Sequence, residues 1–166
     1  RLARRVRAVP QGQGGGSLGR VQDDETPPAA PPSDWAARLL AFWFGAHGVD
    51  DWYGGGAEFD AAVRDLAGEL REALRALPAD SFLTDRDTAL AAAILFDQVP
   101  RNIHRHQAEA FATDELARAI ARGIVARGWD RDWPDERRQF AYLPFEHGED
   151  MADQRESLRL MSQLAD

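Results

Sequence analysis

The chain has 166 residues, of which 44% are hydrophobic and 29% charged, values that suit one globular domain with its own core. Its 28 acidic and 20 basic residues give a net charge of −8, which argues against binding to nucleic acids or anionic membranes. Cysteine is absent and every base is arginine, so disulfides, thiolate zinc sites, cysteine nucleophiles and Schiff-base lysines are excluded. No apolar run approaches the ~20 residues of a membrane span, so a cytoplasmic location is expected.

Residues 1–33 are predicted to form a disordered leader. The segments QGQGGGSLG and TPPAAPPS are rich in glycine and proline and offer little apolar surface to offset chain entropy. Gly14, Gly16 and Gly19 spell a literal GxGxxG, but no strand precedes it and no helix follows it, so no dinucleotide site is predicted. Residues 34–166 are predicted to form a helical domain.

The first half of this domain has apolar residues at helical spacing. A first helix is predicted from the N-cap Ser33 to the glycines at 45 and 48, followed by the loop GVDDWYGGG. A second helix carries an apolar stripe from Phe59 to Leu77 and ends at Pro78. Its opposite face is predicted to be solvated and carries Asp60, Arg64, Asp65, Glu69, Arg71 and Arg75.

Four further helices are predicted along the rest of the chain. One runs from Asp85 to Val99 and is rich in alanine, which indicates a deep position. The next begins at the N-cap Thr113 and ends at Gly128. The last two start near residues 133 and 149, and Pro144 is expected to interrupt the first of them. No stretch alternates like a strand, so we predict an all-α protein of about six helices in antiparallel pairs, either a bundle or a short solenoid.

The segment FDQVPRNIHRHQ, residues 96–107, is the first candidate site. Proline lacks an N–H, so the helix is expected to end near Val99 or to kink there. The polar side chains around Pro100 either anchor the helix end to its neighbours or bind a ligand, with Arg101 holding a carboxylate or phosphate. The candidate ligand-binding residues are Asp97, Gln98, Arg101, Asn102 and Arg105.

The segment PFEHGED, residues 144–150, is the second candidate site. It places His147 among three carboxylates, which can orient an imidazole for acid–base work. The candidate catalytic residues are His147, Glu149 and Asp150. The alternative is a histidine that only caps a helix end, bonded to carbonyls or to Asp150.

Other chemistries receive little support from the sequence. His104 and His106, with His147 and Glu149, could supply metal ligands, but H-x-H side chains diverge on a helix and no HExxH is present. No GxSxG surrounds any serine, so a hydrolase elbow is absent. We therefore predict neither a metal nor a cofactor.

Taken together, these segments resemble a bacterial family known as domain of unknown function 924. The matching pieces are FWFG at 42–45, LFDQVPRN at 95–102, Arg105, AFATD at 110–114 and FAYLPFEHGEDMADQ at 140–154. The resemblance covers residues 34–166 and implies an all-helical fold similar to tetratricopeptide-repeat domains. It implies no particular reaction.

Two departures from the family pattern bear on the site. The family typically has serine where this chain has Gly148, and His104 and His106 do not look like family positions. The family also continues past this point with a further helical segment. If that segment is missing, apolar surface is expected to be exposed and the chain to self-associate.

Three hypotheses for function remain open. The first is a tetratricopeptide-like domain that binds a protein, a peptide or a small anionic ligand. The second is a small-molecule enzyme with His147 as acid–base group, Asp150 or Glu149 orienting it and Arg101 holding an anionic substrate. The third is that both segments are purely structural. An enzyme requires the two segments to converge on one cleft, and Arg101 and His147 are predicted to share one connected polar cluster.

Overall fold

The computed structural model describes residues 29–164, and within this range every regular element is helical. The seven α-helices are α1 (Trp35–Leu40), α2 (Val49–Gly54), α3 (Ala57–Leu74), α4 (Arg86–Ile103), α5 (Asp114–Ala126), α6 (Asp135–Glu146) and α7 (Met151–Met161). Three shorter segments are the π-helix η1 (Ala41–Ala46) and the 3₁₀ helices η2 (Ala79–Phe82) and η3 (Ala108–Phe111). The all-α prediction is confirmed. The predicted leader, 1–33, lies almost wholly outside the described residues.

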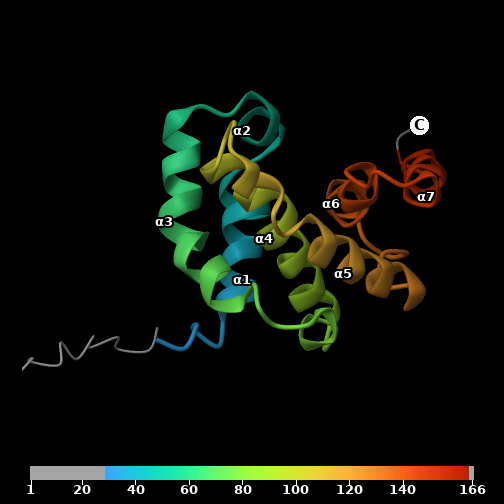
Figure 1. Cartoon of the computed structure of the whole chain (residues 1–166), viewed down its shortest axis with the longest axis horizontal. Coiled ribbons are helices and arrows are strands. Elements are labelled where there is room, and N and C mark those ends of the chain that lie inside the picture. Colours follow the sequence, from blue (N-terminus) through green and yellow to red (C-terminus); the bar gives the residue numbers. More distant parts are fainter. Residues whose placement is uncertain (1–28, 165–166) are drawn as a thin grey trace, which may run out of the picture.

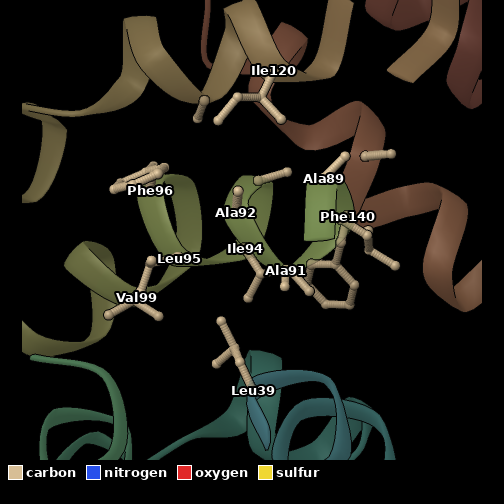
Figure 2. Close-up of a cluster of buried hydrophobic side chains, with 14 of the residues drawn as sticks. Leu39, Ala89, Ala91, Ala92, Ile94, Leu95, Phe96, Val99, Ile120 and Phe140 are labelled. Carbon is tan, nitrogen blue, oxygen red and sulfur yellow. The ribbon is translucent and has the colours of Figure 1, made fainter. Parts of the chain in front are cut away.

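Helix α4 is the centre of the bundle (Figure 1) and contacts α1, α3, α5 and α6. Its residues from Ala89 to Phe96 are all fully buried. Leu39 of α1, Ile120 of α5 and Phe140 of α6 approach it from different sides (Figure 2). The small alanine side chains let neighbouring helices come close, so the alanine-rich segment lies deep, as predicted. Of the helices in residues 29–164, none has the length and apolar character that crossing a bilayer requires.

Pro100 lies inside α4, which continues to Ile103, so of the two alternatives, a helix end near Val99 and a helix that runs on through the proline, the helix end is wrong. Proline cannot donate the hydrogen bond that the carbonyl of Phe96 would accept from position 100. The hydroxyl Oγ1 of Thr113 donates to that carbonyl instead, at 2.7 Å. A side chain at the start of α5 therefore supplies the bond that the proline removes. Pro144 likewise lies inside α6, which runs on to Glu146.

Other local predictions are also wrong: the N-cap of α1 is Asp34 and not Ser33. The predicted loop after residue 48 contains α2, whose first turn holds Asp50 and Asp51, and the Asp51 carboxylate accepts a hydrogen bond from the backbone N–H of Gly48 at 3.3 Å. Acids at this end suit the helix dipole. Arg71, assigned to the solvated face of α3, is fully buried. It follows Ala67 by one helical turn, on the same buried line as Phe59.

Arg71 connects α3 to the chain that leads into α5. Its guanidinium donates to Glu109 at 3.0 Å and to the Thr113 hydroxyl at 3.3 Å. A buried arginine persists only where such partners satisfy its charge. The contacts hold η3 and the start of α5 against the central helices, and this placement sets one wall of the site described below.

The outer face of α7 exposes apolar side chains. Met151 is 65% exposed and Leu158 is 73% exposed, one above the other at a spacing of seven residues. The buried face of the helix carries Asp153, Ser157 and Leu160 instead. Self-association through such a surface stays a prediction.

Candidate functional site

Asp97 is the buried centre of the candidate site, with only 1% of its side chain exposed. Gln98 donates to Oδ2 at 2.7 Å, and Arg101, one turn further along α4, has Nη1 3.4 Å from Oδ1. A buried carboxylate needs such donors because desolvation is costly. Asp97 thus has partners on its own helix, α4, and it has a further partner at the end of α6.

His147 reaches Asp97 from the C-terminal end of α6, where it occupies the C-cap. Its Nδ1 lies 2.7 Å from Oδ1 of Asp97, across 50 positions of sequence. A carboxylate can only accept a hydrogen bond, so Nδ1 carries the proton and, in the neutral ring, Nε2 offers a lone pair. The orienting carboxylate is therefore Asp97, and not Asp150 or Glu149 as expected.

Arg101 joins the same cluster to the start of α5. Its two terminal nitrogens donate to the two carboxylate oxygens of Asp114, at 2.7 and 3.0 Å. Burial opposes the charge of Arg101, but the hydrogen bonds to Asp114 and the nearby charge of Asp97 outweigh it and raise its pKa. Arg101 does clamp a carboxylate, as its chemistry suggested, but the carboxylate belongs to this chain.

Asn102, near the end of α4, and Arg105, in the turn that follows the helix, contact α3. Both donate to Asp60, Asn102 at 2.9 Å and Arg105 at 2.5 and 2.8 Å. The hydrogen bonds from Arg105, and to a smaller extent from Asn102, hold the pKa of Asp60 below its ordinary value. Asp60 was predicted to be solvated, and it is instead the partner that ties the two helices. These two candidate ligand residues are not part of the cluster around Asp97.

Asp150 and Glu149 follow His147 closely in the sequence and differ in their contacts. Asp150 is the N-cap of α7, where it accepts a hydrogen bond from the backbone N–H of Asp153 at 2.8 Å. Hydrogen bonds from the N–H groups of Asp153 and Ala152 hold the pKa of Asp150 below its ordinary value. Glu149 is exposed and makes no hydrogen bond or ion pair within residues 29–164.

A polar cavity of about 440 Å³ opens beside His147, between the start of α5 and the start of α7. This volume is within the range of small-molecule sites. The cavity is lined by Phe111, Ala112, Asp114, Glu115, Arg118, His147, Glu149, Asp150 and Asp153. The two sequence segments meet through Asp97, which contacts both Arg101 and His147, and the prediction that these two share a polar cluster is confirmed. The cavity itself is lined by residues of the second segment and by none of residues 96–107.

Sequence reasoning missed the wall of the cavity contributed by η3 and α5. Asp114 and Phe111 appeared only within the segment AFATD, and Arg118 was not singled out. One signal was available. Glu115 and Arg118 are three residues apart, so the helix predicted from Thr113 places them on one face, next to Asp114.

One group of side chains in the described part of the chain could hold a metal ion. The ligand atoms of Glu72, His104 and Glu109 lie within 4.8 Å of one another. Both carboxylates are, however, already paired with Arg71 and Arg75. Two guanidinium charges beside two carboxylates leave no net negative charge to attract a cation. These residues fit a metal poorly, and His147 is not among them.

Fold and site together define an all-helical domain with a buried aspartate, a histidine and a polar cavity at one end of its central helix. The chain belongs to a family described as bacterial proteins of unknown function (DUF924), whose model matches residues 39–166. A solved structure of a protein of unknown function from Agrobacterium tumefaciens (ATU0120) is similar, with 37% identity and a TM-score of 0.74. The match covers 79% of this chain and 74% of that one. Among curated proteins, no significant match is found.

Proposed function

We propose that the chain is an enzyme that acts on a small polar molecule, with His147 as the group that takes and returns a proton. The observation that carries the proposal is the 2.7 Å bond between Nδ1 of His147 and the buried carboxylate of Asp97, beside a cavity of about 440 Å³. A base held by a carboxylate, with its second nitrogen free, is the arrangement that general acid–base catalysis uses. A cytoplasmic location goes with this proposal.

In this proposal Asp97 is a positioning residue. It fixes the ring and the tautomer of His147, and Arg101 and Gln98 in turn hold Asp97. Arg101 then has no contact with substrate, because both of its terminal nitrogens are bonded to Asp114. The contacts of Arg101 with Asp114 therefore argue against the expectation that Arg101 holds an anionic substrate.

The experiment is a turnover assay with the full chain and pooled small metabolites, followed by mass spectrometry and NMR. His147→Gln is expected to lower the rate of any substrate loss by about 10²-fold or more, the usual contribution of a general acid–base. Asp97→Asn is expected to lower it as well, because asparagine can donate to Nδ1 and so favour the tautomer with its proton on Nε2. The matched control is His47→Gln, whose histidine also bonds a carboxylate but lies outside the cavity.

A second readout needs no substrate. Nitrogen chemical shifts of labelled histidine report the tautomer, and neutral His147 is expected to be protonated at Nδ1 in the wild type. A rate unchanged in His147→Gln would exclude His147 as the acid–base group and leave the Asp97–His147 bond as a structural contact between α4 and α6.

A second candidate is a domain that binds a peptide without chemistry. A neighbouring cavity of about 380 Å³ shares Asp150 and Asp153 with the first, so the two adjoin along α5 and the start of α7. An extended chain could occupy both. A peptide that protects residues of both cavities in NMR titration, with no turnover of any compound, would favour this function.

A further inference from the structure

The charged groups around the cavity divide into those that the fold already satisfies and those that it does not. Asp114 is neutralised by Arg101, and Asp150 accepts the backbone N–H at the start of α7. Asp153 accepts two hydrogen bonds from Arg122, at 2.6 and 2.8 Å. These three carboxylates have partners and are part of the scaffold.

Two carboxylates on the cavity have no such partner. Glu115 comes from the first turn of α5, and Glu149 comes from the link between α6 and α7. Within residues 29–164, neither makes a hydrogen bond or ion pair. Two unpaired carboxylates on different elements of one cavity favour a ligand with a positive charge.

The aromatic ring of Phe111 lines the same cavity and is 59% exposed. The guanidinium of Arg101 lies 5.4 Å from the centre of this ring. Arg101 already makes one cation–π contact with this ring, and the exposed remainder of the ring, beside unpaired carboxylates, can attract an ammonium group, because both the ring quadrupole and the carboxylates attract a cation. The apolar part of a ligand can also pack on this ring.

Arg118 is the cation on the cavity wall. Its Nε lies 3.5 Å from Oδ2 of Asp153, and its side chain makes no hydrogen bond within the described range. Its side chain is 19% exposed, so it is held in place yet can be reached from the cavity. A guanidinium with unused donors binds a planar carboxylate well.

We infer that the ligand of this cavity carries a protonated amine and a carboxylate, as an amino acid does. The amine lies near Glu115, Glu149 and Phe111, the carboxylate meets Arg118, and the part between them faces His147. The inference rests on the proposed function for the place of the ligand, but it names the class of compound independently of any reaction.

The test is an NMR titration of the full chain with three compounds that share a five-carbon skeleton. Norvaline carries both charges, pentylamine only the amine, and pentanoate only the carboxylate. Norvaline is expected to shift the His147 ring signals and to bind about tenfold more tightly than pentylamine, a difference of one well-made charged contact. Pentylamine is expected to bind more tightly than pentanoate.

Three variants assign the contacts. Glu115→Gln and Glu149→Gln are each expected to weaken norvaline and pentylamine binding about tenfold. Arg118→Gln is expected to reduce norvaline to the affinity of pentylamine. The matched control is Glu58→Gln, because Glu58 is also an exposed acid near a helix start but belongs to α3, away from the cavity.

Two results would overturn the inference. If pentanoate binds more tightly than pentylamine, the cavity prefers an anionic ligand and the inferred class of ligand is wrong, although the cavity remains a small-molecule site. Failure of all three compounds to shift His147 at tens of millimolar would exclude the class altogether. In either case the turnover assay with His147→Gln decides separately on the proposed function, because it uses pooled metabolites of every charge.

Discussion

Within residues 29–164, two histidine–carboxylate pairs are formed, and they differ in sequence separation, in distance and in the burial of the carboxylate. His47 approaches Asp51 at 3.1 Å, four residues away, and the Asp51 side chain is 44% exposed. His147 approaches Asp97 at 2.7 Å, 50 residues away, and the Asp97 side chain is 1% exposed. The imidazole exposures are nearly equal, 23% and 24%. The carboxylate, and not the histidine, therefore distinguishes the two pairs.

The surroundings of the two rings explain the difference. The ring of His47 packs against Phe42 and Phe59, with centroids 4.3 and 5.0 Å apart. The ring of His47 is part of an aromatic cluster, and its Nδ1 atom contacts Asp51. His147 instead lies between a fully buried carboxylate and a polar cavity. Replacing corresponding groups in the two pairs should therefore give unequal results.

The largest expected effect is that of removing the buried carboxylate. Asp97→Ala should lower the free energy of unfolding by about 3 kcal/mol or more, because it leaves His147 and Gln98 without their acceptor and removes the negative charge beside Arg101. Asp51→Ala should cost less than about 1 kcal/mol, the usual value for an exposed pair. Urea unfolding followed by circular dichroism measures both. Equal losses would contradict the distinction, and Asp97→Asn serves if the alanine variant does not fold.

A smaller effect is expected from replacing each imidazole by a benzene ring. His147→Phe removes a donor from a buried carboxylate and should cost about 1.5–3 kcal/mol, the value of a hydrogen bond to a charged group. His47→Phe keeps the ring contacts with its aromatic neighbours and should change stability by less than about 1 kcal/mol. Thermal unfolding of the two variants side by side checks the order. A greater loss at position 47 would mean that its ion pair matters more than its packing.

Gly148 offers a way to disturb the cavity without touching the Asp97–His147 bond. A Cβ atom there would lie 2.7 Å from Cβ of Asp153, which Arg122 holds in place. Gly148→Ala should therefore cost about 1 kcal/mol or more. The control Gly45→Ala, where a Cβ meets nothing within 4 Å, should be neutral or slightly stabilising. A neutral Gly148→Ala would show that Asp153 moves freely.

The smallest effect concerns acid stability at the far side of α4. The pKa of Asp60 is lowered in the folded chain, so its contribution is complete above about pH 4, the unfolded value, and is lost as the pH falls through the lower folded value. Because Arg105 is 47% exposed, the contribution should be less than about 1 kcal/mol. Asp60→Asn should flatten the stability curve below pH 4 and change little else. If the free energy of unfolding, measured with urea at several pH values below 4, depends on pH equally in Asp60→Asn and in the wild type, this assignment is refuted.

Much of the fold could be predicted because the helices follow apolar periodicity. The stripe that begins at Phe59 and the run of alanines in α4 each gave a helix and its depth. Arg71 was misassigned because residue type was given more weight than position: it lies on the buried line of α3. The helix α2 was missed because its glycine-rich surroundings resemble a loop.

The site could be predicted only in part. Sequence chemistry pointed to His147 and Asp97, but pairing across 50 positions depends on how α4 and α6 pack, which periodicity does not give. The sequence therefore predicted that Asp150 or Glu149, which are close to His147 in the chain, orients the imidazole. The lining residues on η3 and α5 were missed for the same reason, since a cavity wall forms only when separate elements meet.

The hydrogen bond from Thr113 to the carbonyl of Phe96 makes two distant positions depend on each other. Alone, Thr113→Val should leave that buried carbonyl without a donor, at a cost of about 1–3 kcal/mol. With Pro100→Ala in the same chain, the restored backbone N–H can serve the carbonyl, and the loss should shrink. The two substitutions are then non-additive, as a double-mutant cycle would measure. As long as residue 100 is proline, position 113 needs a side chain that can donate a hydrogen bond to the carbonyl of Phe96. This constraint on sequence divergence links two positions that belong to different helices.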